Sequence, residues 1–339
     1  MAITIKKSDN LLNSEWNEEA EFINMKMADA DTEQSDDDAL VKAVFNVRTS
    51  NRFGEKAVGS SGYQSMHTVE EGGTFATDTM QNVNEKLIKH ISFGKEYSIT
   101  PEMKEDNLHN ITGRAAKNMV RAYKRTRPEF ATAALVATVA SDAKTFSYGG
   151  TTAIDCTAPD NLSLFNPAHT GLTGVAAQSN VFTNAFGNDD EMLDRLANIG
   201  FNFVNASGQH MGYVFDTLIV PGNCHRLIRL AKKIINSDQQ VGSNFNDANI
   251  NKGMWKLIVD PYWQAAASTE PYIIMSSKAN KDIEGSMFYD RLILDVKEDL
   301  DIHTHGMIFS GRARMGVGFT DWRHIILGGS TQTGATTLK

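Results

Sequence analysis

The chain has 339 residues, of which 41% are apolar, so it is long enough for two domains or for one elaborate α/β body. No stretch approaches the ~18 consecutive apolar residues that a membrane span requires, and the amino terminus lacks the apolar core of a secretory signal. Cys156 and Cys224 are far apart and belong to no CxxC pair, which argues against a disulfide framework or a structural zinc site. These features indicate a globular protein of a reducing cytoplasm.

The net charge of −8 is concentrated in one segment. Residues 15–38 contain ten acids and one base, Lys26, which gives this segment a local net charge of −9. The rest of the chain is therefore close to neutral, which argues against a strongly basic nucleic-acid-binding protein. An arm this acidic is expected to be a solvated tail, and its ordering against the protein would require positive partners.

A ribbon without a core of its own is expected next. Residues 41–62 should pass through a short apolar strand, LVKAVFNV, into a Gly/Ser-rich link. One limb of a hairpin is expected at residues 64–69, a tip at 70–73, and a return limb from Val83 that is uniformly apolar on neither face. A two-stranded ribbon of this kind is marginal by itself and needs a partner surface.

The longest helical pattern covers residues 110–142. Apolar residues recur at three- and four-residue steps along one face, and Asn110 is a suitable N-cap. At about 1.5 Å per residue the helix would be roughly 45–50 Å long, and Pro128 predicts a kink within it. Flanked by β-rich sequence, the helix is expected to be a spine, although an ordinary core helix with a basic solvated face stays open. The face opposite the apolar one carries a basic stripe, formed by Arg114, Lys117, Arg121 and Lys124.

The remaining sequence predicts a mixed α+β protein. A short helix should begin at Thr100–Pro101, and the Gly/Ser/Thr/Asn-rich residues 145–180 should form a long functional or interfacial loop. Helices are expected at residues 189–199 and 225–236, and a buried strand at residues 216–221. Short strands are expected at residues 256–259, 271–275 and 292–296, followed by long alternating runs at 302–309, 313–319 and 322–327.

No catalytic constellation is evident. The chain has no phosphate loop, dinucleotide fingerprint, HExxH or GxSxG motif. The best metal candidate is His303 with His305, which alternate along a strand and could be joined by His324, but nothing completes the ligand set that zinc needs. Two exposed histidines are more simply explained as solvated residues, and Cys224 beside His225 as packing at a helix start. We therefore expect neither an enzyme nor a cofactor.

Several stretches carry a resemblance to a known family. They are FGKEYSITPEMKEDN before the spine, LFNPAH and GVAAQSN within residues 145–180, DTLIVPGNCHRLIRLAKKIINS with WKLIVDPYW, and FSGRARMGVGFTDWRHIILGG. Together with the order of arm, ribbon, spine, α/β region and closing strands, they make most of residues 60–330 similar to the major capsid proteins of tailed bacteriophages. Those proteins have the Hong Kong 97 type of fold, and the pattern is most similar to Mu-type head subunits.

The resemblance implies a shell protein that self-assembles as hexamers and pentamers into an icosahedral head around a double-stranded DNA genome. It implies an N-terminal arm at residues 1–62, an extended loop at 63–92, an axial domain at 180–280, and a peripheral domain at 93–179 and 281–339, which includes the C-terminal tail. The side chains expected at contacts between subunits are Met66, His67, Glu70, Glu71, Lys86 and Lys89; no crosslink is expected from the two lysines.

The implied partners are other copies of the chain, a separate scaffolding protein, a portal and other head proteins, and packaged DNA contacted non-specifically; no membrane is involved. The implied location is the virion, after assembly in the host bacterial cytoplasm. Three alternatives stay open: an encapsulin-like shell, a soluble metal-dependent enzyme that uses His303 and His305, and a minor virion component. For the acidic arm, we favour a position along a basic stripe, its own or a neighbour's, over a stripe that meets DNA phosphates.

Overall fold

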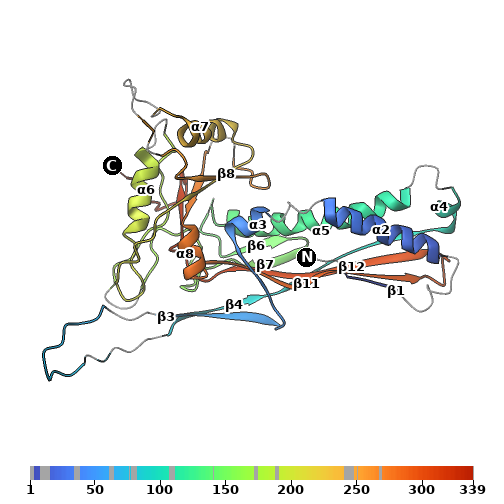
Figure 1. Ribbon diagram of the computed structural model, residues 1–339, viewed down its shortest axis with the longest axis horizontal. Helices are drawn as coiled ribbons and strands as arrows, with labels where there is room; N and C mark the ends of the chain where they lie inside the picture. Colours follow the sequence, from blue (N-terminus) through green and yellow to red (C-terminus); the bar gives the residue numbers. More distant parts are fainter. Residues whose placement is uncertain are drawn as a thin grey trace.

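The computed structural model describes residues 4–7, 16–33, 39–60, 65–75, 77, 82–106, 111–139, 141–171, 175–187, 191–239, 248–249, 251–266 and 269–338. Two long helices lie along one sheet, a smaller sheet with its own helices stands at one end, and a two-stranded ribbon projects beyond both (Figure 1). The expected α+β class is confirmed. Within the described residues, no helix has both the length and the apolar content needed to cross a bilayer.

The larger sheet, called here the long sheet, has the strand order β1-β11-β12-β5, with β2 also paired to β11. Its centre is the antiparallel hairpin of β11 (Ser286–Leu300) and β12 (Met307–Phe319), so β11 is much longer than the strand expected at residues 292–296. The other strands are β5 (Ile91–Ile99), antiparallel to β12, and β1 (Thr4–Lys7) and β2 (Asn46–Thr49), each parallel to part of β11.

The spine helix, α5 (Ile111–Val136), lies on this sheet beside α2 (Asn17–Glu33) (Figure 1). It is shorter than the expected range 110–142, and Asn110 lies outside the described residues. In α2, four small or apolar residues recur at three- and four-residue steps and are buried against α5 and the sheet: Ala20, Ile23, Met27 and Ala30. The expectation of a solvated tail is therefore wrong for residues 16–33, because an acidic composition conceals a complete apolar face.

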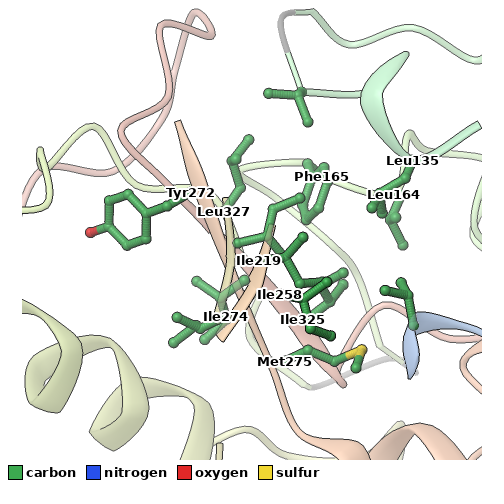
Figure 2. Close-up of a cluster of buried hydrophobic side chains, with 14 of the residues drawn as sticks. Leu135, Leu164, Phe165, Ile219, Ile258, Tyr272, Ile274, Met275, Ile325 and Leu327 are labelled. Atoms are coloured by element: carbon green, nitrogen blue, oxygen red, sulfur yellow. The ribbon is translucent and has the colours of Figure 1, made fainter. Parts of the chain in front are cut away.

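The smaller sheet, called here the short sheet, has the order β13-β10-β8-β9. Its strands are β8 (Thr217–Pro221), β9 (Lys256–Asp260), β10 (Tyr272–Met275) and β13 (Ile325–Gly328), and its helices are α6 (Glu191–Phe201), α7 (His225–Asn236) and α8 (Ser277–Asp282). Figure 2 shows Ile219 and Ile325 of this sheet in one cluster with Leu135 of the spine and Phe165. The two parts of the molecule therefore share one core.

The smaller elements are α3 (Ala39–Val44), β3 (Gly54–Ser60), β4 (Asn82–Lys89), α4 (Pro101–Glu105), β6 (Thr145–Tyr148) and β7 (Thr151–Asp155). Two expectations here are wrong. Residues 39–44 form a helix rather than a strand, because Val41 and Val44 lie three residues apart on one buried face. The outgoing limb of the ribbon is β3 rather than residues 64–69, because Gly59 and Ser60, which look like a linker, pair with β4.

The LFNPAH stretch explains how the polar segment between β7 and α6 is fastened. The ring of His169 stacks on Trp322, with centroids 4.2 Å apart, and its Nδ1 atom lies 2.6 Å from Asp160 Oδ2. The side-chain amide of Asn180 donates to the carbonyl of Leu164 at 2.9 Å. The segment is thus held to the core by buried polar groups that satisfy one another.

A buried ion pair joins the spine to the long sheet. Arg127 donates from Nη1 and Nη2 to the two carboxylate oxygens of Asp290 at 2.7 and 3.0 Å, and both side chains are buried. The guanidinium carbon also lies 5.2 Å from the centroid of the Phe288 ring. Asp290 stands where the register of β11 against β12 shifts, so the bulge and the ion pair occur at one point of the sheet.

The first prediction concerns this pair. Arg127→Ala should destabilise the subunit by about 3–5 kcal/mol, because it removes the bidentate partner of a buried carboxylate. The double variant Arg127→Leu/Asp290→Leu removes both charges and should recover most of that loss. Urea denaturation of the unassembled subunit measures both changes; a double variant no more stable than the single one would contradict this account.

The second prediction concerns acid. His324 is buried with Nε2 2.7 Å from Ser286 Oγ, and burial lowers the pKa of His324 from 6.5 to about 4. Between these values the unfolded chain binds more protons than the native one. Stability should therefore be complete above pH 6.5 and fall by about 3 kcal/mol as the pH drops toward 4. His324→Gln should flatten this slope, with a remainder from His90, whose pKa burial also lowers. Urea titrations of the variant that keep the wild-type slope would rule out His324 as its source.

Candidate functional site

The ribbon ends in a segment that its own subunit does not cover. Every residue from 65 to 75 is exposed, including the apolar Met66 (101%) and Phe75 (86%). The tip at 70–73 is a turn closed by Gly73 N–H on the carbonyl of Glu70 at 2.8 Å, with Gly72 at a φ of +80° that favours glycine. Residues 65–75 therefore present apolar side chains, the acids Glu70 and Glu71, and His67, all of them exposed.

The root of the ribbon is fastened within the subunit. Lys86 is 4% exposed, and its Nζ atom donates to Asp155 Oδ2 at 2.6 Å and to Thr157 Oγ1 at 2.5 Å. Burial raises the pKa of Asp155, but hydrogen bonds from Lys86 and Thr157 outweigh it and hold that pKa below its usual value. Lys86 thus anchors its own subunit, which corrects its expected place among the intersubunit residues, whereas Lys89 is exposed. Asp155 lies 69 residues along the chain, so no sequence signal pointed to this pairing.

The acidic arm contacts the spine of its own chain. Lys124 Nζ lies 2.9 Å from Asp31 Oδ1 and also donates to the Asp31 carbonyl oxygen. At the other end of α2, Thr112 Oγ1 donates to Glu19 Oε1 at 2.9 Å. These contacts place the arm against its own spine, the arrangement favoured over a lumenal stripe. Periodicity of the buried residues of α2 is the signal that could have identified its packing face.

The basic stripe is divided by this contact. Lys124 is buried beneath the arm, Arg114 and Arg121 are exposed, and Lys117 is half-buried. Pro128 is buried inside α5, which runs through the proline rather than ending at it. The stripe is therefore in part a structural feature of the subunit.

The groups considered for chemistry are far apart. His303 and His305 lie in the exposed turn between β11 and β12, while His324 is buried beyond the other end of β12, whose 13 residues span about 40 Å. Burial raises the pKa of the Cys224 thiol, the opposite of what a reactive thiolate needs. Across the described ranges, no group of three or more His, Cys, Asp or Glu residues is placed to hold a metal ion. The ligand set considered for His303 and His305 needed His324 beside them, and the structure places it at the opposite end of β12.

Comparison with known proteins identifies the architecture. A family model described as phage capsid protein matches residues 84–327. The capsid of an empty GTA particle is similar, with a TM-score of 0.53 and 12% identity over 86% of this chain and 89% of that chain. The capsid of the Myoviridae phage XM1 is similar with a TM-score of 0.51 and 13% identity over 85% and 90% of the two chains. No curated protein sequence matches the chain.

The matched range covers well over half of the chain. It includes most of the return limb of the ribbon, the spine, the main strands of both sheets and the first part of β13. The solved structures, at these identities, support the fold. The resemblance to tailed-phage major capsid proteins, the Hong Kong 97 type of fold and the function of a shell-forming capsid protein are confirmed. The chain belongs to the phage capsid protein family.

Proposed function

We propose that this capsid protein is the repeating subunit of an icosahedral head, assembled as hexamers and pentamers around double-stranded DNA. The observation that carries the proposal is the uncovered end of the ribbon, residues 65–75, which exposes Met66, Val69 and Phe75. Full burial of such a side chain is worth about 1.5–3 kcal/mol, and a lone two-stranded ribbon is marginal in water. A neighbouring copy that covers the tip would supply this stabilisation only in the assembled shell.

The other parts of the chain take roles consistent with this proposal. Residues 1–62 are the arm, 63–92 the extended loop, 180–280 the axial domain, and 93–179 with 281–339 the peripheral domain. Pro128 marks a place where the spine could adapt to rings of five and six. A scaffolding protein, a portal and other head proteins would be separate chains that bind the shell. Assembly would take place in the host bacterial cytoplasm, before the virion is released. None of these roles requires catalysis.

The third prediction tests the ribbon. Replacement of residues 65–77 by a short Gly/Ser linker should leave a folded subunit that cannot close shells, because these residues bury little within their own subunit. The replacement must spare Lys86, Ile88 and His90, which are buried at the root. Circular dichroism and urea denaturation report folding, and sedimentation velocity with electron microscopy reports assembly.

Point variants provide the matched control. Phe75→Ser should leave the urea midpoint of the free subunit unchanged and lower the yield of shells, because this side chain is exposed in the free subunit. Ile88→Ala, at a residue that is 3% exposed, should instead destabilise the subunit by about 2–5 kcal/mol. Two results would argue that the tip does not contact a neighbour. One is a linker variant that is already unfolded without urea, and the other is a normal yield of shells from Phe75→Ser.

The fourth prediction tests the arm. Arg121→Glu with Lys124→Glu should release α2 to protease and lower shell yield even without DNA, because Lys124 would become a like charge beside Asp31. Raising salt from 0.1 to 1 M shortens the Debye length from about 10 to about 3 Å, but it should loosen α2 only in part. The apolar face of α2, which includes Ile23 and Met27, is unaffected by screening.

Lys42→Glu is the control for that variant, because this exposed lysine lies on α3, outside both α2 and the spine. It should leave the protease pattern unchanged. If the spine variant forms empty shells normally with α2 still protected, the ion pair has no part in assembly, and the basic stripe belongs to the genome or to solvent.

A further inference from the structure

Helix α7 carries a basic face that the subunit leaves uncovered. Leu227, Ala231, Ile234 and Ile235 are buried, and the helix contains no acid. Its exposed face carries four cations, Arg226, Arg229, Lys232 and Lys233. Helix α7 is therefore amphipathic: its apolar side packs against the subunit, and its exposed side is strongly positive.

Only one of these four cations has an acidic partner among the described residues. Arg226 pairs with Glu270, whereas the other three make no ion pair within the part of the chain that the structure describes. Charge of one sign on one face, in a chain whose net charge is −8, marks a surface suited to an acidic partner. Two copies of α7 that met face to face would repel each other, so contact of this face with itself is unfavourable.

An acidic surface lies at the other side of the short sheet. Helix α6 packs against β13, and α7 packs against β8 and β9; β13 and β9 are the two outer strands of that sheet. Figure 1 shows α6 and α7 on different flanks of this part of the molecule. The first turn of α6 carries Glu191 and Asp194, both exposed, and Glu191 pairs with Arg195 on the same helix.

These positions are complementary in a ring. Subunits arranged head-to-tail around an axis make heterologous contacts, in which one flank of each copy meets the opposite flank of the next. We propose that the basic face of α7 docks on the first turn of α6 in the adjacent copy, with Arg229 and Lys232 toward Glu191 and Asp194. The partner is thus a second copy of this chain. The contact rests on the proposed function, because it requires rings of subunits, and it adds a charge-matched contact distinct from the ribbon.

Charge exchange tests this contact. Arg229→Glu with Lys232→Glu reverses the α7 face, and Glu191→Lys with Asp194→Lys reverses the α6 face. Near 0.1 M salt, each reversal alone should lower the assembled fraction by about tenfold, and the four changes combined should restore it to within about threefold of the wild type. Recovery in the combined variant is specific to facing charges, since damage to folding at two sites would add rather than cancel.

Controls separate folding from docking. Lys144→Glu with Lys281→Glu reverses two exposed lysines outside α7 and should assemble like the wild type. The α7 reversal and the lysine control should keep the urea midpoint of the free wild-type subunit. The α6 reversal removes the Glu191–Arg195 pair and two acids at a helix N-terminus, so it should lower the urea midpoint and still leave a folded subunit. Sedimentation velocity gives the assembled fraction, and absorbance at 260 and 280 nm gives the nucleic acid content of the shells.

Three results would contradict the proposed contact. The first is an α7 reversal that assembles as well as the lysine control. The second is a combined variant whose assembled fraction is no higher than that of either reversal alone. Normal shells that hold less nucleic acid after α7 reversal would assign the face to the genome instead. A wild-type chain that forms neither rings nor shells would contradict the proposed function itself, whereas wild-type shells with unaffected variants would contradict only the contact between α7 and α6.

Discussion

The buried pair of Arg127 and Asp290 is the constraint on which the arrangement of the subunit depends. Moving two charges out of water is unfavourable, and it is tolerated only where geometry and hydrogen bonds compensate. Here the guanidinium meets both carboxylate oxygens and lies near the Phe288 ring, while the register shift occurs at the residue that supplies the carboxylate. The pair therefore fixes where along the long sheet the spine lies. Because Leu135, two turns further along the spine, packs in the core of the short sheet, the same pair also sets where that sheet stands.

The sequence predicted best those elements whose residues act locally. The helix at His225–Asn236 and the strand at Thr217–Pro221 were expected nearly at their observed bounds, because apolar periodicity and a buried apolar run decide them. It predicted least well the elements that depend on remote partners. Residues 17–33 were expected to be solvated, since their composition is acidic. In the structure, apolar residues spaced three and four apart form one face of this helix, and that face packs on a sheet built mainly from the other end of the chain. Lys86 was expected to reach a neighbour, and its actual partner, Asp155, becomes adjacent only when the ribbon root folds onto β7.

The acidic composition of the arm does not determine where its helix lies. Six acids lie within α2, yet two of them, Glu19 and Asp31, face the spine and bond to Thr112 and Lys124. Lys124 is buried in its contact with Asp31, so the attraction of the pair is offset by the unfavourable removal of both charges from water, and these polar contacts orient the helix more than they hold it. The burial of Ile23 and Met27 supplies the larger part of the attachment. The described part of the arm, α2, is thus an amphipathic helix whose polar side is mainly acidic.

The ribbon combines a fixed root with an uncommitted tip, and this combination suits association. Lys86 with Asp155 and His90 with Ser50 hold the root, so the direction of the projection is set before any partner arrives. Ordering a flexible segment on binding opposes association, whereas a segment already directed by its root loses less freedom. Among the described residues 65–75, in contrast, the hydrogen bonds within the subunit are the one that closes the turn and one from Ser65 Oγ to Gln209 Oε1 at 3.3 Å, so a partner would have little to displace. If a neighbouring copy covers the tip as proposed, the buried lysine at the root would aid assembly indirectly, by lowering the entropic penalty for making that contact.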